Sequence, residues 1–262
     1  MMSNQGLTGK HALVTGGSRG IGFAVAQGLL GMGASVTLVG RGQAALEQAA
    51  AELAHSGQVA IASGDISEQA DVQRLFQQAQ AALGVVDILV NNAGQAASER
   101  FDRIDVADWQ QMIAVNLTGT FHCMQAALPG MVERGWGRIV NVASTAGLVG
   151  YAYVSAYCAA KHGVIGLTRA LAQETAQKGV TVNAVCPGYT ETDIVRDAVV
   201  NIQEKTGMSA EQARARLSGR NPQGRLVQPA EVADAVVWLC LPGAAAINGQ
   251  AIPIDGGEVM VG

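Results

Sequence analysis

Thr15-Gly16-Gly17-Ser18-Arg19-Gly20-Ile21-Gly22 is the stretch that decides the fold of this chain. It follows an apolar run, His11–Thr15, and precedes a segment of helical period, Gly22–Gly31. Glycines between a strand and a helix let the backbone turn sharply and approach a pyrophosphate, which the free N–H groups and dipole of the helix favour. The spacing G-x-x-x-G-x-G differs from the general G-x-G-x-x-G fingerprint. In this context it still predicts a dinucleotide site.

Short β-branched runs alternate with longer Ala- and Leu-rich segments along the rest of the chain, which is typical of strand–helix units with a parallel sheet. The expected fold class is α/β, a single-domain Rossmann-type doubly wound sheet of seven parallel strands flanked by helices on both faces. Strands are predicted at His11–Thr15, Ser35–Val39, Val59–Ser63, Ile88–Asn91, Arg138–Val142, Thr181–Val185 and Ala251–Ile254. Main helices are predicted at Gly22–Gly31, Ala44–His55, Glu68–Leu83, Ala107–Val132, Ala156–Gln177 and Glu231–Leu241.

The length of 262 residues is compatible with one domain, residues 1–262, because open α/β sheets commonly reach this size as one unit. The composition, 49% hydrophobic and 15% charged with 33 glycines, suits buried parallel strands joined by tight turns. One long gap in the alternation, Tyr189–Val227, carries polar, helix-prone sequence such as Ser209–Leu217. Such an excursion predicts a substrate lid, and a plain surface insertion is the alternative.

Charge and cysteine usage exclude several classes of partner. The net charge of -4, with mixed signs along the chain, gives no basic footprint for nucleic acid or an anionic membrane. The cysteines Cys123, Cys158, Cys186 and Cys240 are widely spaced, which predicts buried free thiols and no zinc site. The segment Met1–Lys10 lacks the pattern of a signal peptide, and no apolar run is long enough to span a membrane. We expect a cytoplasmic location.

The end of the second predicted strand bears on the choice of cofactor. An NAD site normally has a carboxylate there for the ribose 2′-hydroxyl, whereas this strand ends Val39-Gly40-Arg41. With Arg19 also in the glycine-rich loop, charge complementarity favours the 2′-phosphate of NADP(H). The alternative is that Arg41 begins a solvated loop. Asp65 follows the third strand and Asn91-Asn92-Ala93-Gly94 ends the fourth, so both lie at the sheet edge where ligands bind.

Tyr157 and Lys161 lie four residues apart near the start of a predicted helix and therefore share a face. Bringing a phenol from a pKa of about 10 to near 7 needs roughly 4 kcal/mol. A cation at ~4 Å in an effective dielectric of ~20 supplies about that much. Lys161 could thus lower the pKa of Tyr157 and make it a general acid/base.

Two further polar residues strengthen this hypothesis. Ser144 lies thirteen residues before Tyr157, at the end of a strand, where its hydroxyl could hydrogen-bond a substrate oxygen. Asn116 is a polar interruption of a helix that otherwise looks buried, and is either a satisfied core amide, a helix kink or a group that holds a proton-relaying water. Tyr151, Tyr153 and Tyr189 flank these residues, and either pocket lining or packing would explain them.

With these residues in place, the chain resembles the short-chain dehydrogenase/reductases over nearly its whole length. The order and spacing of Thr15–Gly22, Asp65, Asn91–Gly94, Ser144 and Tyr157, with Asn116, Lys161 and Pro187-Gly188, carry the resemblance. It implies a catalytic tetrad of Asn116, Ser144, Tyr157 and Lys161, with Thr192 close to the nicotinamide amide. It also implies hydride transfer between a nicotinamide cofactor and a ketone or secondary alcohol, without a metal. The expected cofactor contacts are Gly16, Ser18, Arg19, Gly20, Ile21, Gly22, Arg41, Asp65, Ile66, Asn92, Ala93, Gly94, Tyr157, Lys161, Pro187, Gly188, Thr190 and Thr192.

Within that family, Val182–Gly188, Ser155–Gly163 and Val227–Ala233 are similar to 3-oxoacyl-thioester and aromatic-polyketide ketoreductases. Similar segments occur in NAD-dependent 3-hydroxyacyl-CoA and secondary-alcohol dehydrogenases, so these remain alternatives. A non-catalytic sensor of the cofactor is an alternative from another class, and the intact tetrad argues against it. A sugar-nucleotide epimerase or dehydratase that uses the same Tyr–Lys pair is a third. The family also implies a homotetramer or homodimer, packed through helices Ala107–Val132 and Ala156–Gln177.

Overall fold

The computed structural model describes residues 6–260, so the first half of the segment Met1–Lys10 lies outside it. Its centre is one sheet of seven parallel strands in the order β3-β2-β1-β4-β5-β6-β7. The order reverses between β1 and β4, the point at which open α/β sheets bind ligands. The strands are β1 His11–Thr15, β2 Ser35–Gly40, β3 Val59–Ser63, β4 Ile88–Asn91, β5 Gly137–Val142, β6 Val180–Pro187 and β7 Ala251–Ile254. All seven predicted strands are confirmed.

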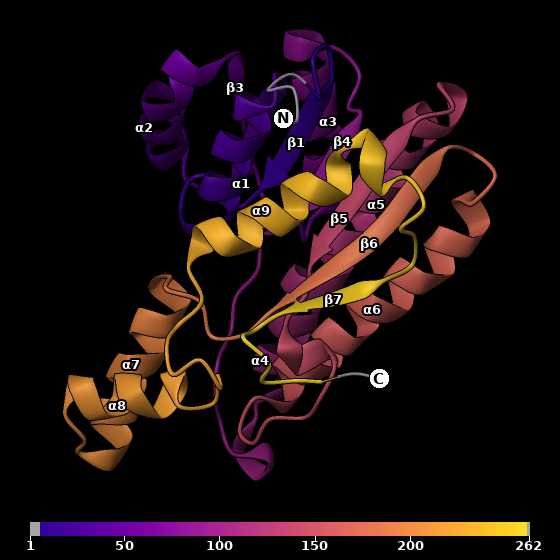
Figure 1. The fold of residues 1–262 in the computed structure, drawn as a ribbon. Coiled ribbons are helices and arrows are strands. Elements are labelled where there is room, and N and C mark those ends of the chain that lie inside the picture. The colour runs from indigo at the N-terminus through magenta and orange to yellow at the C-terminus, as the bar shows by residue number, and fades with distance from the viewer. Residues whose placement is uncertain (1–5, 261–262) are drawn as a thin grey trace.

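Helices cover both faces of this sheet, which confirms the predicted fold class (Figure 1). One apolar core joins the sheet to α1 (Gly20–Gly31), α2 (Gln43–Leu53) and α9 (Pro229–Cys240). A second core, on the opposite face, joins it to α3 (Gln69–Leu83), α5 (Gly119–Glu133) and α6 (Ser155–Thr175). Strands buried on both faces explain the near-continuous apolar runs in the sequence. Short 3-10 turns complete the chain: η1 Ala54–Ser56, η2 Phe101–Arg103, η4 Thr145–Gly147 and η5 Pro242–Ala244.

The predicted helix Ala107–Val132 is helical throughout, but it contains a π-helical turn that was not predicted. Helix α4 covers Val106–Ile113, the π turn η3 covers Ala114–Thr118, and α5 follows. The side chain of Asn116 donates to the carbonyl oxygen of Met112 at 3.1 Å, and Thr120 donates to the carbonyl of Asn116 at 3.0 Å. π turns inside α-helices frequently occur at functional sites.

The excursion Tyr189–Val227 contains two helices, where one was predicted. Helix α7 (Asp193–Thr206) precedes α8 (Ala210–Ser218), and a capping box at Ser209 starts the second. The ends of the excursion pair with each other, since Val227 N donates to the carbonyl of Tyr189 at 3.0 Å. Both helices lie beside the sheet edge at which β6 ends (Figure 1). Their role as a lid stays a prediction.

Two general features of the described part of the chain concern its class. No helix within residues 6–260 is both long and apolar enough to cross a membrane. The four cysteines are buried and free, as predicted.

Candidate active site

The glycine-rich loop between β1 and α1 needs glycine for geometric reasons. Gly16 and Gly20 have positive φ angles of 64° and 55°. A Cβ on Gly22 would lie 2.2 Å from the carbonyl oxygen of Gly16, so only glycine fits this close approach. Helix α1 has no side-chain cap at Arg19 and no acidic residue in its first turn. Its first N–H groups can therefore bind phosphate oxygens, and the loop fits a pyrophosphate.

The loop is fixed to the end of β4 by Thr15 and Asn92. The Thr15 hydroxyl accepts hydrogen bonds from the backbone N–H groups of Asn92 and Ala93, both at 3.0 Å. The side-chain amide of Asn92 donates to the carbonyls of Thr15 and Gly16, at 3.0 and 3.1 Å. Asn92 therefore holds the loop through its side chain, which is a structural task that the sequence argument did not assign to it.

The two arginines expected to select NADP(H) have different surroundings. Arg41 is exposed directly after β2, where no carboxylate follows the strand. The Arg19 guanidinium pairs at 2.9 Å with the carboxylate of Asp193, the first residue of α7. Asp65 accepts hydrogen bonds from the N–H and hydroxyl of Ser67, at 2.9 and 2.7 Å. Sequence reasoning missed Asp193, because a lone acidic residue after a glycine-containing loop carries no distinctive signal.

Ser144, Tyr157 and Lys161 are brought together where β5 ends and α6 begins. Ser144 caps the turn η4 and accepts a hydrogen bond from the N–H of Ala146 at 3.1 Å. The Ser144 side chain also hydrogen-bonds Tyr157. The ammonium of Lys161 lies 5.6 Å from the ring centroid of Tyr157 and donates to the carbonyl of Val142 at 2.9 Å. The helical spacing predicted the grouping of Tyr157 with Lys161, and the position of Ser144 at a strand end predicted its place beside them.

Asn116 joins the same group from the π turn. Its Oδ1 accepts from the N–H of Gln95 at 3.2 Å, and its Nδ2 donates to the Gln95 carbonyl at 3.0 Å. A Cβ on Gly94 would lie 2.7 Å from Asn116 Oδ1 and 3.7 Å from Lys161 Nζ, so both side chains border Gly94. Asn116 is thus a satisfied buried amide at a helix irregularity and also a neighbour of Lys161.

The electrostatics of Tyr157 differ from the expectation. Burial raises the pKa of its phenol to about 12, and the hydrogen bond with Ser144 opposes this rise. Burial lowers the pKa of the Lys161 ammonium to about 8. The expected lowering of the phenol pKa to near 7 by Lys161 is therefore wrong for the chain by itself. The reason is that desolvation disfavours the charged form of both groups.

A second cluster of polar side chains lies beside these residues, and the sequence did not predict that they form a cluster. The hydroxyl of Tyr151 donates to the carboxylate of Glu258 at 2.8 Å. The guanidinium of Arg220 lies 4.8 Å from the centroid of the Tyr151 ring and 4.0 Å from the same carboxylate oxygen. These residues are far apart in sequence, so no local pattern could have connected them. Burial raises the pKa of Tyr189, the fourth member, with Arg220 lowering it and Glu258 raising it.

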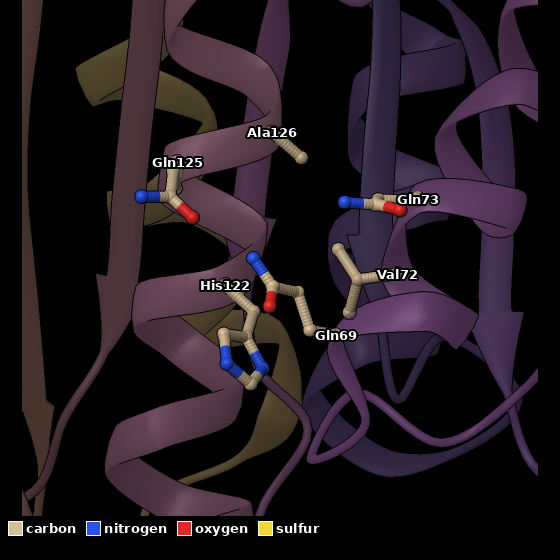
Figure 2. A pocket seen from close by; sticks show the side chains of 6 residues that line it. All are labelled: Gln69, Val72, Gln73, His122, Gln125 and Ala126. Atoms are coloured by element: carbon tan, nitrogen blue, oxygen red, sulfur yellow. The ribbon is translucent and has the colours of Figure 1, made fainter.

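Two other features of residues 6–260 lie outside this group of side chains. A hollow between α3 and α5 contains none of the candidate residues; in it the side chains of Gln69 and His122 approach each other (Figure 2). The residues that line it are Gln69, Val72, Gln73, His122, Gln125 and Ala126. Within the described chain, no three His, Cys, Asp or Glu side chains are arranged to hold a metal ion.

Known proteins share this geometry and sequence. The family model for short chain dehydrogenases matches residues 10–202. The chain is 43% identical over 257 residues to a D-beta-hydroxybutyrate dehydrogenase of Cupriavidus necator, covering 97% of this chain and 99% of that protein. It is 37% identical over 254 residues to a 3-oxoacyl-[acyl-carrier-protein] reductase of Aquifex aeolicus, covering 96% and 98%. A crystal structure of a variant actinorhodin polyketide ketoreductase with NADPH superposes with a TM-score of 0.91 at 38% identity, covering 95% and 97%. The chain therefore belongs to the short chain dehydrogenase family and is an oxidoreductase of that family.

Proposed function

We propose that this protein transfers a hydride between NADP(H) and a ketone or secondary alcohol, with 3-oxoacyl thioesters or related ketones as its substrates. One observation carries the proposal. Four polar side chains meet at the carboxyl edge of the sheet, next to Gly94 and close to the glycine-rich loop: those of Asn116, Ser144, Tyr157 and Lys161. A sensor of the cofactor would need the loop and not this group of side chains.

Each of these side chains has a task in the proposed reaction. A nicotinamide cofactor supplies the hydride when bound. The Ser144 hydroxyl binds the carbonyl oxygen of the substrate, and Tyr157 delivers a proton to that oxygen. The pKa of Tyr157, raised to about 12 by burial, keeps the phenol protonated at neutral pH, as an acid must be. The Lys161 ammonium stabilises the phenolate that remains. Oxidation of an alcohol follows the same path in reverse.

The charged residues around the expected cofactor site support the choice of NADP(H). Arg41 and Arg19 are the cations nearest in sequence to the end of β2 and the phosphate loop, and no carboxylate follows β2. The ketoreductase with a similar structure was crystallised with NADPH. We therefore assign the 2′-phosphate to Arg41 and Arg19, and the nicotinamide end to Pro187, Gly188, Thr190 and Thr192.

A second candidate function is supported by a specific comparison. The relative that is 43% identical is named a D-beta-hydroxybutyrate dehydrogenase. An NAD-dependent oxidation of a hydroxy acid or secondary alcohol would use the same four residues. The two candidates differ in the cofactor and, for a hydroxy acid, in the charge of the substrate.

We also propose a cytoplasmic homotetramer or homodimer whose contacts include α4, α5 and α6. Trp109 on α4 and Phe121 on α5 are 41% and 43% exposed, which is unusual for large aromatic side chains. A shallow apolar groove beside Phe121 reaches α6 at Gly163 and Leu167. Light scattering of the purified protein tests this assembly, and a monomer would contradict it.

The substitution Tyr157→Phe tests the catalytic proposal. We expect turnover of ketones to fall by at least a thousandfold while binding of the reduced cofactor, followed by its fluorescence, is kept. Tyr153→Phe is the matched control, because the Tyr153 side chain is 64% exposed. Near-normal rates for Tyr157→Phe would remove the assignment.

A further inference from the structure

The carboxylate of Glu258 is buried where three distant segments meet. Its side chain is only 8% exposed, just beyond β7. One oxygen, Oε1, accepts a hydrogen bond from Tyr151 at 2.8 Å, in the segment that follows Ser144. The same oxygen lies 4.0 Å from the guanidinium of Arg220, which follows helix α8. A buried charge at such a junction requires an explanation, since burial of charge is costly.

Glu258 lies close to the candidate active site along two paths. Tyr151 also hydrogen-bonds Thr145, the neighbour of Ser144. On the other side, Oε2 of Glu258 is 3.2 Å from where a Cβ on Gly188 would lie, and Gly188 precedes Tyr189. Tyr189 lies near enough to Tyr157 to contribute, after burial, to the raised pKa of the Tyr157 phenol. The carboxylate is therefore connected to Ser144 through Tyr151 and Thr145, and to Tyr157 through Gly188 and Tyr189.

The charge of Glu258 is only partly compensated. Its Oε1 contacts both Tyr151 and Arg220, and among residues 6–260 no group donates a hydrogen bond to Oε2. The Arg220 side chain is 49% exposed, and solvent screens its positive charge more strongly than the buried negative charge. The ion pair between Arg220 and Glu258 is also weak, because its separation of 4.0 Å is beyond hydrogen-bond distance. The electrostatic potential on the side of the site that faces Tyr189 and Tyr151 is thus more negative than the equal number of positive and negative side chains suggests.

We propose that Glu258 is a specificity-determining residue that selects uncharged 3-oxoacyl esters and thioesters against free 3-oxo acids. A free 3-oxo acid carries its carboxylate one methylene from the reacting ketone. In the proposed binding mode the ketone lies at Ser144 and this arm of the substrate extends toward Tyr151 and Tyr189, so the carboxylate approaches Glu258. Like charges in a desolvated site repel each other, whereas an ester or thioester carries no charge there. The inference rests on the proposed function and names its substrate class.

The test uses two substrates that differ only in charge, acetoacetate and methyl acetoacetate. We expect the unmodified protein to show at least a tenfold higher kcat/KM for the ester. In Glu258→Gln, which has nearly the same shape, that ratio should fall about tenfold through faster turnover of the acid. Glu211→Gln removes the same charge from exposed helix α8 and should leave the ratio unchanged. An unchanged ratio in Glu258→Gln, or an equal fall in Glu211→Gln, overturns the inference.

A second variant covers the case in which Glu258→Gln does not fold. Arg220→Gln leaves Glu258 in place without its partner, so the ratio should rise, and a fall would contradict the inference. Failure of the proposed function would look different: neither compound would be turned over, or turnover would survive Tyr157→Phe. In that case the affinities for the two compounds would be compared instead. They would be measured from the change in fluorescence of bound NADPH on titration with each compound. Equal affinity ratios in the unmodified protein and Glu258→Gln would overturn the inference there too.

Discussion

Arg19 and Asp193 form an ion pair at 2.9 Å that joins the glycine-rich loop to the first residue of α7. Asp193 also pairs with Arg196 of the same helix at 2.7 Å. The Arg19 and Asp193 side chains are 76% and 33% exposed, so this pair contributes little to stability. Its consequence concerns the proposed cofactor site, since under the proposed function Asp193 competes with a 2′-phosphate for Arg19.

Asp193→Asn should therefore lower the KM for NADPH about two- to fivefold and leave the KM for NADH nearly unchanged. The reason is that Arg19 loses its competing anion, and only NADPH carries the phosphate that gains from this. Asp197→Asn, an exposed carboxylate on the same helix, is the control. Steady-state kinetics with both cofactors decides the matter, and a parallel change for NADH would argue against a role of Arg19 at the phosphate.

Arg41→Asp should reverse the preference between cofactors. A carboxylate at this position repels a 2′-phosphate and accepts a hydrogen bond from a ribose 2′-hydroxyl. We expect kcat/KM for NADPH to fall at least tenfold and that for NADH to rise. If the preference stays as it was, Arg41 only begins a solvated loop.

Gly22→Ala should damage the phosphate loop, whereas Gly31→Ala should not. A Cβ on Gly22 would meet the Gly16 carbonyl oxygen at 2.2 Å, whereas a Cβ on Gly31 meets nothing within 4 Å. Both glycines lie on α1, so they form a matched pair. We expect Gly22→Ala to lose about 1–3 kcal/mol of unfolding free energy and most cofactor affinity. Gly31→Ala should keep or slightly increase stability, since glycine costs about 0.5–1 kcal/mol in a helix. Urea unfolding and cofactor titration measure both effects.

Lys161 should make stability rise with pH above about 8. Its pKa is 10.5 when unperturbed and about 8 when buried. Between these values the unfolded chain holds a proton that the folded protein has lost, so unfolding takes up a proton and its free energy increases with pH. In this window the unfolding free energy of the unmodified protein should rise relative to that of Lys161→Met by up to about 1 kcal/mol per pH unit. Urea unfolding at pH 7.5, 8.5 and 9.5 measures it, with the exposed Lys178→Met as control. Parallel curves for Lys161→Met and the unmodified protein would contradict the expectation.

The strands and the grouping of Tyr157 with Lys161 could be predicted because they depend on local periodicity. Apolar runs bounded by turns identify buried strands, and a spacing of four identifies one helix face. The π turn at Asn116 could not be predicted this way. The Asn116 side chain accepts a hydrogen bond from the N–H of Gln95 and donates one to its carbonyl, and Gln95 follows β4, which is distant in sequence. Likewise α7 has a weak local signal and is packed through Val195 against Leu217 and Leu226.

The sequence by itself determined the parallel α/β fold, the glycine-rich loop and the order of the candidate catalytic residues, since glycine conformations and short-range spacing specify these. Only the tertiary structure decided which charges meet. It placed Asp193 next to Arg19, Glu258 between Tyr151 and Arg220, and Lys161 in a site where burial lowers the pKa of its ammonium. Pairing and desolvation depend on distances between segments far apart in the chain, and sequence spacing carries no record of those distances.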